Sequence, residues 1–300
     1  MRVGTILDLN RVAKDVFISI FSKYPISQEV ERLAEVGAEH IEFTLDLLFS
    51  HHKMKEAFTK ERERLKEIAK DLSLTYSFHL PTTGGFCVGS CWEAVRLGSI
   101  AWLREFVEWA KPLDAQGYTI HPKALEDVCQ LDLGPMEGGW VPMRKVYEHF
   151  TESVILPGER ESVAAIRSFL DPSKIFLENS EAADFSILGD FPLESGYSVC
   201  MDAGHCYLWR QGVKDFVQKY RSVLRHVHLH DVVEEPERQP WGRRDHRPLG
   251  TGIVNVQEVI TELRSINFKG AVVIEDYFQD PSHSIRFLYK ELKGISRGVS

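Results

Sequence analysis

The 300-residue sequence predicts an α/β fold, a (β/α)8 TIM barrel that forms a single domain over residues 1–300. Apolar segments typical of strands alternate about eight times with helical segments, at intervals of roughly 25 to 45 residues. This alternation implies parallel strands joined by right-handed crossovers, and eight such units fit a closed barrel better than an open sheet. No Gly-x-Gly-x-x-Gly follows the first strand segment, so a dinucleotide-binding sheet has little support.

The N-terminal part of the chain supplies four of the predicted strands. Ser27 is expected to cap a helix whose apolar residues recur at helical spacing until Gly37 ends it. The charged stretch before Leu72 predicts an amphipathic helix. Pro81 is expected to end the strand that begins at Thr75. The apolar segment 16–21 fits neither pattern clearly. The expected strands are 2–9, 40–45, 75–81 and 117–122, and the expected helices are 27–37, 55–72 and 93–110.

The C-terminal part continues the same alternation. Its strand segments are short, rich in Val, Ile and Leu, and bounded by Gly, Pro or polar residues. Its helices are amphipathic, with a short one at best over 184–188. The expected strands are 174–179, 197–202, 226–231 and 270–276, and the expected helices lie within 143–170 and over 213–220, 256–263 and 282–292.

Composition limits the function classes. The net charge of −8 and the isoelectric point of about 5.9 argue against a nucleic-acid surface. No apolar run approaches the length of a membrane span, and the first residues show no signal-peptide pattern. The five cysteines are odd in number and fit no disulfide framework, which favours a reducing, cytoplasmic location. We expect a small-molecule substrate and no membrane partner, with a homo-oligomer left open.

The segment His226-Val227-His228-Leu229-His230-Asp231 alternates histidine with apolar residues. In a strand, this period places the three histidines on one face. Imidazole is a common metal ligand and a proton carrier near neutral pH. A shared site would require similar groups at the ends of other strands.

Such groups follow the other predicted strands at their carboxyl ends, where the chemistry of these barrels lies. Each has apolar neighbours, so the two-residue period turns it toward the barrel axis while the neighbours pack under the helices. Burying these carboxylates together would be costly without a cation, and mixed imidazole and carboxylate ligands suit zinc, manganese, iron or cobalt. The residues are His79, His121, Glu178, Asp202, His228, His230 and Glu275.

The ordered motifs resemble the xylose-isomerase-like TIM-barrel superfamily, which contains sugar phosphate isomerases and epimerases and AP endonuclease-like proteins. The resemblance runs in family order from about residue 75 to 276, and the first 70 residues add little. The motifs are Phe78-His79-Leu80-Pro81, Ile120-His121-Pro122, Leu177-Glu178-Asn179, Asp202-Ala203-Gly204-His205, His228-Leu229-His230-Asp231, His246-Arg247-Pro248-Leu249-Gly250-Thr251-Gly252 and Ile274-Glu275.

The resemblance implies a metal centre formed by Glu178, Asp202, His228 and Glu275. In the sugar branch, these four positions hold one divalent ion, often manganese, and the two glutamates also move protons on opposite faces of the substrate. In the endonuclease branch, a cluster of zinc ions is held by a larger set, which adds here His79, His121, His205 and His246.

One further aspartate ligand of the endonuclease branch falls here on Arg244, with Asp245 one place away. This departure favours one or two metal ions per chain, manganese or zinc, over three. Among the remaining candidates, His226 is expected to lie deeper in the barrel in a structural role. Asp231 and Asp276 are out of phase with the ligands and are expected to orient loops or neighbours.

The first functional hypothesis is a sugar or sugar-phosphate isomerase or epimerase. In it, Glu178 and Glu275 are catalytic and transfer the proton, while His205 or Arg247 stabilises the enediolate oxygen. His230, His246 and Arg247 are expected to bind the substrate.

The alternative is a hydrolase of a phosphoester, in which His79 and His121 hold a second metal ion that helps to activate water. The acidic chain favours a small phosphodiester, or a corrinoid with a nucleotide tail, over DNA. A third class, a non-catalytic ligand-binding barrel, would leave the carboxylates without a chemical task.

Overall fold

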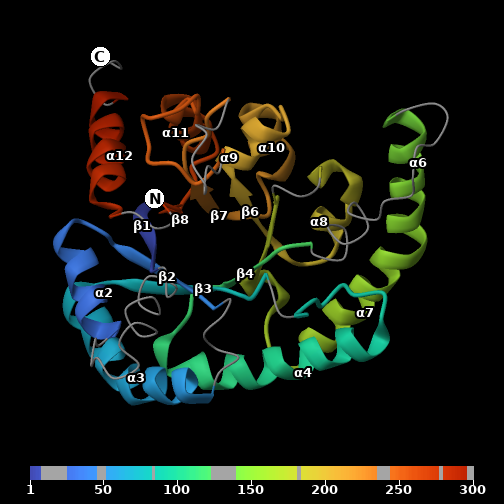
Figure 1. Cartoon of the computed structure of the whole chain (residues 1–300), viewed down its shortest axis with the longest axis horizontal. Coiled ribbons are helices and arrows are strands. Elements are labelled where there is room, and N and C mark those ends of the chain that lie inside the picture. Colours follow the sequence, from blue (N-terminus) through green and yellow to red (C-terminus); the bar gives the residue numbers. More distant parts are fainter. Residues whose placement is uncertain are drawn as a thin grey trace.

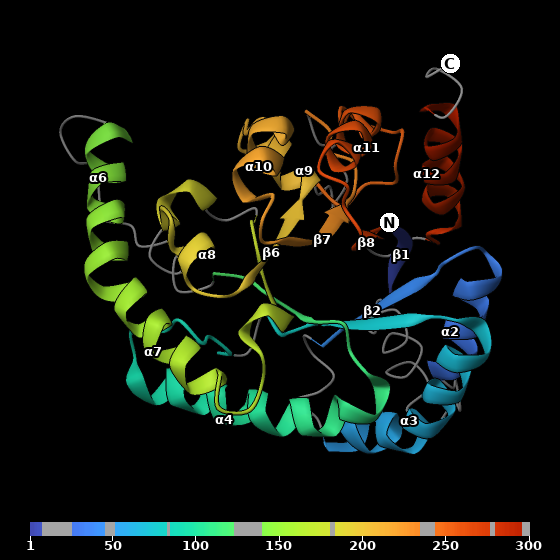
Figure 2. The same ribbon diagram turned by 180° about the vertical axis from the view of Figure 1, so that it is seen from behind.

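The protein was analysed as a computed structural model, which describes residues 1–7, 26–45, 52–82, 85–122, 140–180, 184–234, 244–276 and 280–295. Within these ranges, the strands form one closed parallel barrel in sequence order, and β1 pairs with β8 to close it. Helices cover the outside of the strands, with α2, α3 and α4 on one side and α10, α11 and α12 on the other (Figures 1 and 2). The predicted (β/α)8 fold is confirmed.

The strands are short, and their register brings the polar residues of neighbouring strands level with each other. Asp202 pairs with His228, and Thr44 pairs with His79. The strands are β1 (Arg2–Leu7), β2 (His40–Thr44), β3 (Thr75–His79), β4 (Tyr118–Ile120), β5 (Ile175–Glu178), β6 (Ser198–Asp202), β7 (Leu224–Leu229) and β8 (Ala271–Ile274).

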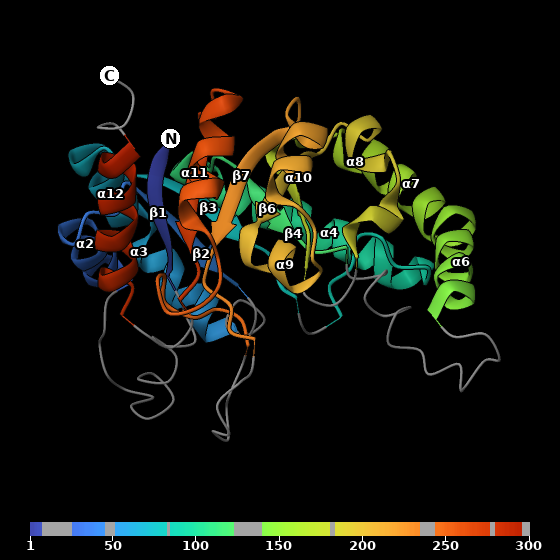
Figure 3. The same cartoon turned by 90° about the horizontal axis from the view of Figure 1, so that it is seen from above.

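The helices follow the predicted order, and α6, a π-helical turn and α7 succeed one another without interruption. Figure 3 shows α6 at the opposite end of the molecule from α12. None of the helices in the described ranges is both long and apolar enough to span a membrane. The helices are α2 (Ile26–Glu35), α3 (His52–Leu72), α4 (Glu93–Ala110), α6 (Trp140–Phe150), α7 (Leu156–Ile166), α8 (Phe191–Glu194), α9 (Ala203–Leu208), α10 (Val213–Tyr220), α11 (Val256–Ser265) and α12 (Ser282–Ile295), with short turns η1 (Lys111–Leu113), η2 (Thr151–Ile155), η3 (Pro172–Lys174) and η4 (Phe185–Leu188).

The start of α2 differs from the sequence prediction. Ser27 is not the cap, because the helix already includes Ile26. The carboxylate of Glu61, on α3, accepts the backbone N–H groups of Ile26 at 2.9 Å and of Ser27 at 2.7 Å. A side chain from the neighbouring helix therefore takes the place of the local cap, since the first N–H groups of a helix need acceptors from outside it.

The two faces of the strands divide the core as the alternation predicts. Outward-facing residues such as Phe43, Phe78 and Leu229 belong to one large apolar cluster beneath the helices. Inside the barrel, only Ile6, Ala271 and Val273 form an apolar cluster among the described residues. The rest of the described interior is rich in buried histidines, carboxylates and hydroxyl groups.

Candidate metal centre

Four side chains meet at the carboxyl ends of neighbouring strands. Glu178 ends β5, Asp202 ends β6, His228 lies on β7, and Glu275 follows β8. Each offers one ligand atom, these atoms lie within 4.8 Å of one another, and all four residues are buried. The four residues predicted from the sequence thus share one place in the barrel.

Two oxygen atoms of the buried carboxylates lack a hydrogen-bond donor in the described ranges. Oδ2 of Asp202 and Oε1 of Glu275 have no hydrogen-bond partner in the described ranges. The ring nitrogens recorded near them are Nδ1 of His205 at 3.5 Å and Nδ1 of His228 at 3.4 Å. Buried anionic oxygens need a cation or a hydrogen-bond donor. Three carboxylates and an imidazole therefore fit a divalent metal ion of the manganese or zinc type.

Glu178 faces two groups of histidines. Its Oε1 atom lies 2.8 Å from Nδ1 of His228, while its Oε2 atom lies 3.2 Å from Nε2 of both His79 and His121. Burial acts to raise the pKa of Glu178, but the charges of His228 and His121 outweigh it and hold that pKa well below its ordinary value. Glu178 therefore connects the four-residue centre to a second group of histidines.

His79 and His121 form that second group. Nδ1–H of His79 donates to the carbonyl oxygen of Leu80 at 3.0 Å, which leaves Nε2 facing Glu178. The rings of His79 and His121 lie 5.2 Å apart, edge to face. The structure brings together the pair expected to hold a second metal ion.

Asp202 is held in place by its neighbours. Its Oδ1 atom accepts the backbone N–H of His205 at 2.7 Å and so caps α9, a helix that the sequence analysis did not expect. The amide of Asn179 accepts the backbone N–H of Asp202 at 2.7 Å and donates to its carbonyl oxygen at 2.8 Å. Helix capping and this paired amide fix the direction in which the carboxylate points.

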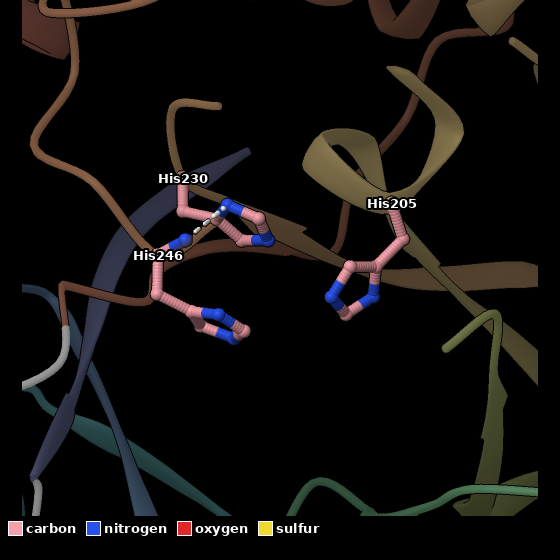
Figure 4. A group of neighbouring side chains, drawn as sticks. All are labelled: His205, His230 and His246. Carbon is pink, nitrogen blue, oxygen red and sulfur yellow. Dashed lines mark hydrogen bonds between the residues drawn. The ribbon is translucent and has the colours of Figure 1, made fainter. Parts of the chain in front are cut away.

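Three further histidines lie beside Asp202. Figure 4 shows these residues, His205, His230 and His246, with their rings close together. Nδ1–H of His205 donates to the carbonyl oxygen of Asn179 at 2.9 Å. Nδ1 of His230 accepts the backbone N–H of His246 at 2.9 Å, and its Nε2 atom lies 3.1 Å from Oδ1 of Asp202. The rings of His230 and His246 are stacked with centroids 4.2 Å apart. His230 therefore connects Asp202 with the loop that carries His246.

The sequence predicted only in part how the polar residues 244–247, in the loop after β7, lie in the structure. The carboxylate of Asp245 lies 3.3 Å from Nδ1 of His246 and 4.0 Å from Nε2 of His205. Asp245 thus reaches the histidines although it is one place from the family position, which Arg244 occupies on the exposed surface. Arg247 is half-buried, and its Nε atom has no hydrogen-bond partner in the described ranges.

The protonation states follow from this crowding. Burial acts to raise the pKa of Asp202, but His205 and His230 lower it to about 2. Burial acts to lower the pKa of His246, but its contacts with Asp245 and Glu275 raise it to about 9. Asp202 and His246 are therefore each stabilised in the charged form by their neighbours.

The sequence analysis missed Glu42. This residue of β2 is fully buried, and its Oε1 atom lies 2.7 Å from Nε2 of His228. Its Oε2 atom lies 2.9 Å from Nε2 of His226, whose ring stacks on Phe176 below the centre. The structural role expected for His226 is consistent with this position. The signal was the period-two polar pattern of His40, Glu42 and Thr44, which equals the pattern of β7.

Several residues lie away from the centre or cannot be placed. His149 is exposed, Cys91 is exposed, and Cys87 is buried. Asp276 accepts a hydrogen bond from the hydroxyl of Ser284 at 2.6 Å, in agreement with its expected role in orienting neighbours. The segment 16–21, His51, Cys129 and Trp241 are outside the described residues.

Comparison with known proteins agrees with this architecture. The model of the xylose isomerase-like TIM barrel family matches residues 30–291. No curated protein matches the chain closely enough to count as a relative.

Solved structures of sugar epimerases are among the similar folds. A D-tagatose 3-epimerase-like protein has a TM-score of 0.68 at 18% identity, with 100% of both chains covered. The 3-keto-D-glucoside 4-epimerase of E. coli has a TM-score of 0.59 at 16% identity, with 99% of both chains covered. A putative sugar phosphate isomerase/epimerase of Anabaena variabilis has a TM-score of 0.63 at 16% identity, covering 90% of this chain and 92% of that one. Identities this low show a shared fold. Together with the family match, they lead to the conclusion that the chain belongs to the xylose isomerase-like TIM barrel family.

Proposed function

We propose that this chain is a divalent-metal-dependent isomerase or epimerase of a sugar or sugar phosphate. The observation that carries the proposal is the meeting of Glu178 and Glu275, from strands on opposite sides of β6 and β7, in one buried group of candidate metal ligands. The names of the similar structures, a D-tagatose 3-epimerase-like protein and a putative sugar phosphate isomerase/epimerase, are consistent with it. Manganese or zinc is the proposed ion.

Bound by Glu178, Asp202, His228 and Glu275, the ion would polarise a carbonyl group of the substrate. One glutamate then removes the proton from the carbon beside that carbonyl, and the other returns a proton to the opposite face. His205 or Arg247 is proposed to stabilise the enediolate oxygen, and His230 and His246 are proposed to form the wall on which the substrate rests.

The test is proton exchange. The manganese-loaded protein is incubated in deuterated water with a panel of keto-sugars and their phosphates, and deuterium beside the carbonyl is measured by NMR. Glu178→Gln and Glu275→Gln are each expected to abolish exchange. Glu159→Gln, which alters a buried carboxyl group on α7, is the control. Absence of exchange with every substrate, in protein shown to contain metal, would contradict the proposal.

A second function is favoured by one observation, the contact of Oε2 of Glu178 with both His79 and His121. A carboxylate with ligand groups on both sides is the arrangement that bridges two metal ions, and paired ions activate water for phosphoester hydrolysis. A small phosphodiester, including one with a corrinoid and a nucleotide tail, is then the proposed substrate.

Metal content separates the two functions. In the hydrolase, the purified chain is expected to hold two ions, and the double variant His79→Ala/His121→Ala should hold one and lose phosphodiesterase activity. In the isomerase, the double variant should hold the same single ion as the unaltered chain. If the unaltered, metal-loaded chain bound a sugar or phosphodiester but neither exchanged a proton nor hydrolysed it, a ligand-binding role would replace both proposals.

A further inference from the structure

Glu42 is a buried carboxylate to which four side chains are directed. Oε1 faces Nε2 of His228 at 2.7 Å. Oε2 accepts from the hydroxyl groups of Ser77 at 2.5 Å and Thr119 at 3.2 Å, and it faces Nε2 of His226 at 2.9 Å. Only an ionised carboxylate, which has acceptors and no donor, satisfies this arrangement.

The neighbours of Glu42 are arranged to donate to it. His40, on the same strand, contacts the hydroxyl of Thr75 through Nδ1 and that of Ser77 through Nε2, both at 2.8 Å. Because the Ser77 hydroxyl gives its hydrogen to Glu42, it accepts from Nε2–H of His40. Nδ1 of His40 then accepts from Thr75. The hydroxyl of Ser77 is thereby held toward Glu42.

Both ring nitrogens of His228 face carboxylates. With Nε2–H donating to Glu42, Nδ1 keeps its lone pair and faces Glu178 and Glu275 at 2.8 and 3.4 Å. We infer that Glu42 is a positioning residue that fixes the tautomer and direction of His228, so that His228 binds the metal ion through Nδ1. This inference rests on the metal centre proposed above.

The chemistry of the contact gives Glu42 a definite effect. A carboxylate that accepts from the far nitrogen of a metal-binding imidazole orients the ring and raises its basicity, and loss of such a partner weakens metal binding about 10- to 100-fold. An amide at this place would bring an NH2 group against other donors. Glu42→Gln therefore removes the charge and disturbs the direction of the ring while keeping the size of the side chain.

The experiment measures manganese(II) alone, without substrate. The free ion is counted by electron paramagnetic resonance during titration of the full chain. Glu42→Gln is expected to raise the dissociation constant about 10- to 100-fold. Glu159→Gln, also a buried glutamate, is expected to keep the value of the unaltered chain. An unchanged constant in Glu42→Gln would overturn the inference and leave the metal centre standing, whereas absence of binding by the unaltered chain would overturn both.

A spectroscopic measurement distinguishes positioning from a general loss of structure. In the zinc-loaded chain with ¹⁵N-labelled histidine, His228 is expected to show a metal-bound Nδ1 and a protonated Nε2. In Glu42→Gln, the Nε2–H signal should move upfield as its charged acceptor is lost. If Glu42→Gln does not fold, Glu42→Asp keeps the negative charge near Ser77, Thr119 and His226 but withdraws the carboxylate from His228. It should still bind manganese more weakly than the unaltered chain, and equal binding by Glu42→Asp would overturn the inference.

Discussion

The carboxylate of Asp231 accepts the backbone N–H of Gly252 at 2.8 Å. The same Oδ2 atom accepts from Gly250 at 2.9 Å, while Oδ1 accepts from Val232 at 2.9 Å and Val254 at 3.0 Å. The backbone of Asp231 also pairs with that of Arg247. One buried side chain thus anchors the loop that carries His246 and Arg247, as expected for a residue out of phase with the ligands.

Asp231→Asn is expected to loosen this loop, because its NH2 group would face backbone N–H donors. Leaving buried donors without an acceptor costs about 1–3 kcal/mol. The free energy of unfolding in urea should fall by that amount, and the KM for the substrate should rise as His246 and Arg247 lose their position. Asp215→Asn, on the exposed surface of α10, is the control. Equal stability of the two variants would contradict the anchoring role.

Metal binding is expected to stabilise the fold. Four carboxylates, from Glu42, Glu178, Asp202 and Glu275, are buried around His228 and repel one another without a cation. An ion at 100 times its dissociation constant should add about 2.7 kcal/mol to the free energy of unfolding. Differential scanning calorimetry with chelator and then with manganese measures the shift in Tm. In Glu178→Gln the shift should be smaller, and an equal shift would place the ion elsewhere.

The raised pKa of Glu159, which lies outside the metal centre, should make the free energy of unfolding depend on pH. Burial raises the pKa of Glu159 from 4.5 to about 7, although the nearby charge of Arg96 lowers it in part. Between these values the unfolded chain releases the proton and the folded chain retains it, so stability falls as the pH rises. The full loss, about 3 kcal/mol, is reached above pH 7.

Glu159→Gln is expected to remove this slope, since an amide does not titrate. The variant should match the unaltered chain near pH 4 and be more stable at pH 8, as measured by urea unfolding across that range. Glu63→Gln, on the exposed surface of α3, is the control and should keep the slope. Equal slopes in Glu159→Gln and the unaltered chain would show that ionisation of Glu159 does not lower the free energy of unfolding.

The barrel and the inward-facing polar residues at its strand ends could be predicted from the sequence because both depend on local periods. Asp202 ends β6 and His228 lies next to the end of β7, and the apolar neighbours of both residues indicate which face points inward. Glu42 has the same signal, but it lies in the middle of the barrel and not at a strand end, so its contact with His228 depends on closure of the sheet. Glu61 likewise caps α2 from 35 residues away. Contacts between distant segments leave no period in the sequence.

Gly204 links the Asp202-Ala203-Gly204-His205 motif to the metal centre. A Cβ atom at this position would overlap the ring of His230, whose Nε2 atom lies 3.1 Å from Asp202. Helix propensity alone would favour alanine in α9 by about 1 kcal/mol. The overlap outweighs this preference, because His230 is buried and its Nδ1 atom is held by the backbone of His246.

Gly204→Ala is therefore expected to lower the free energy of unfolding and to weaken manganese binding, since a displaced His230 no longer supports Asp202. Gly98→Ala is the matched control, because it also lies in a helix and a Cβ there would meet no atom within 4 Å. That variant should gain about 0.5–1 kcal/mol of stability and leave manganese binding unchanged. Similar behaviour of the two variants in urea unfolding and manganese titration would show that His230 yields without consequence and that Asp202 does not depend on it.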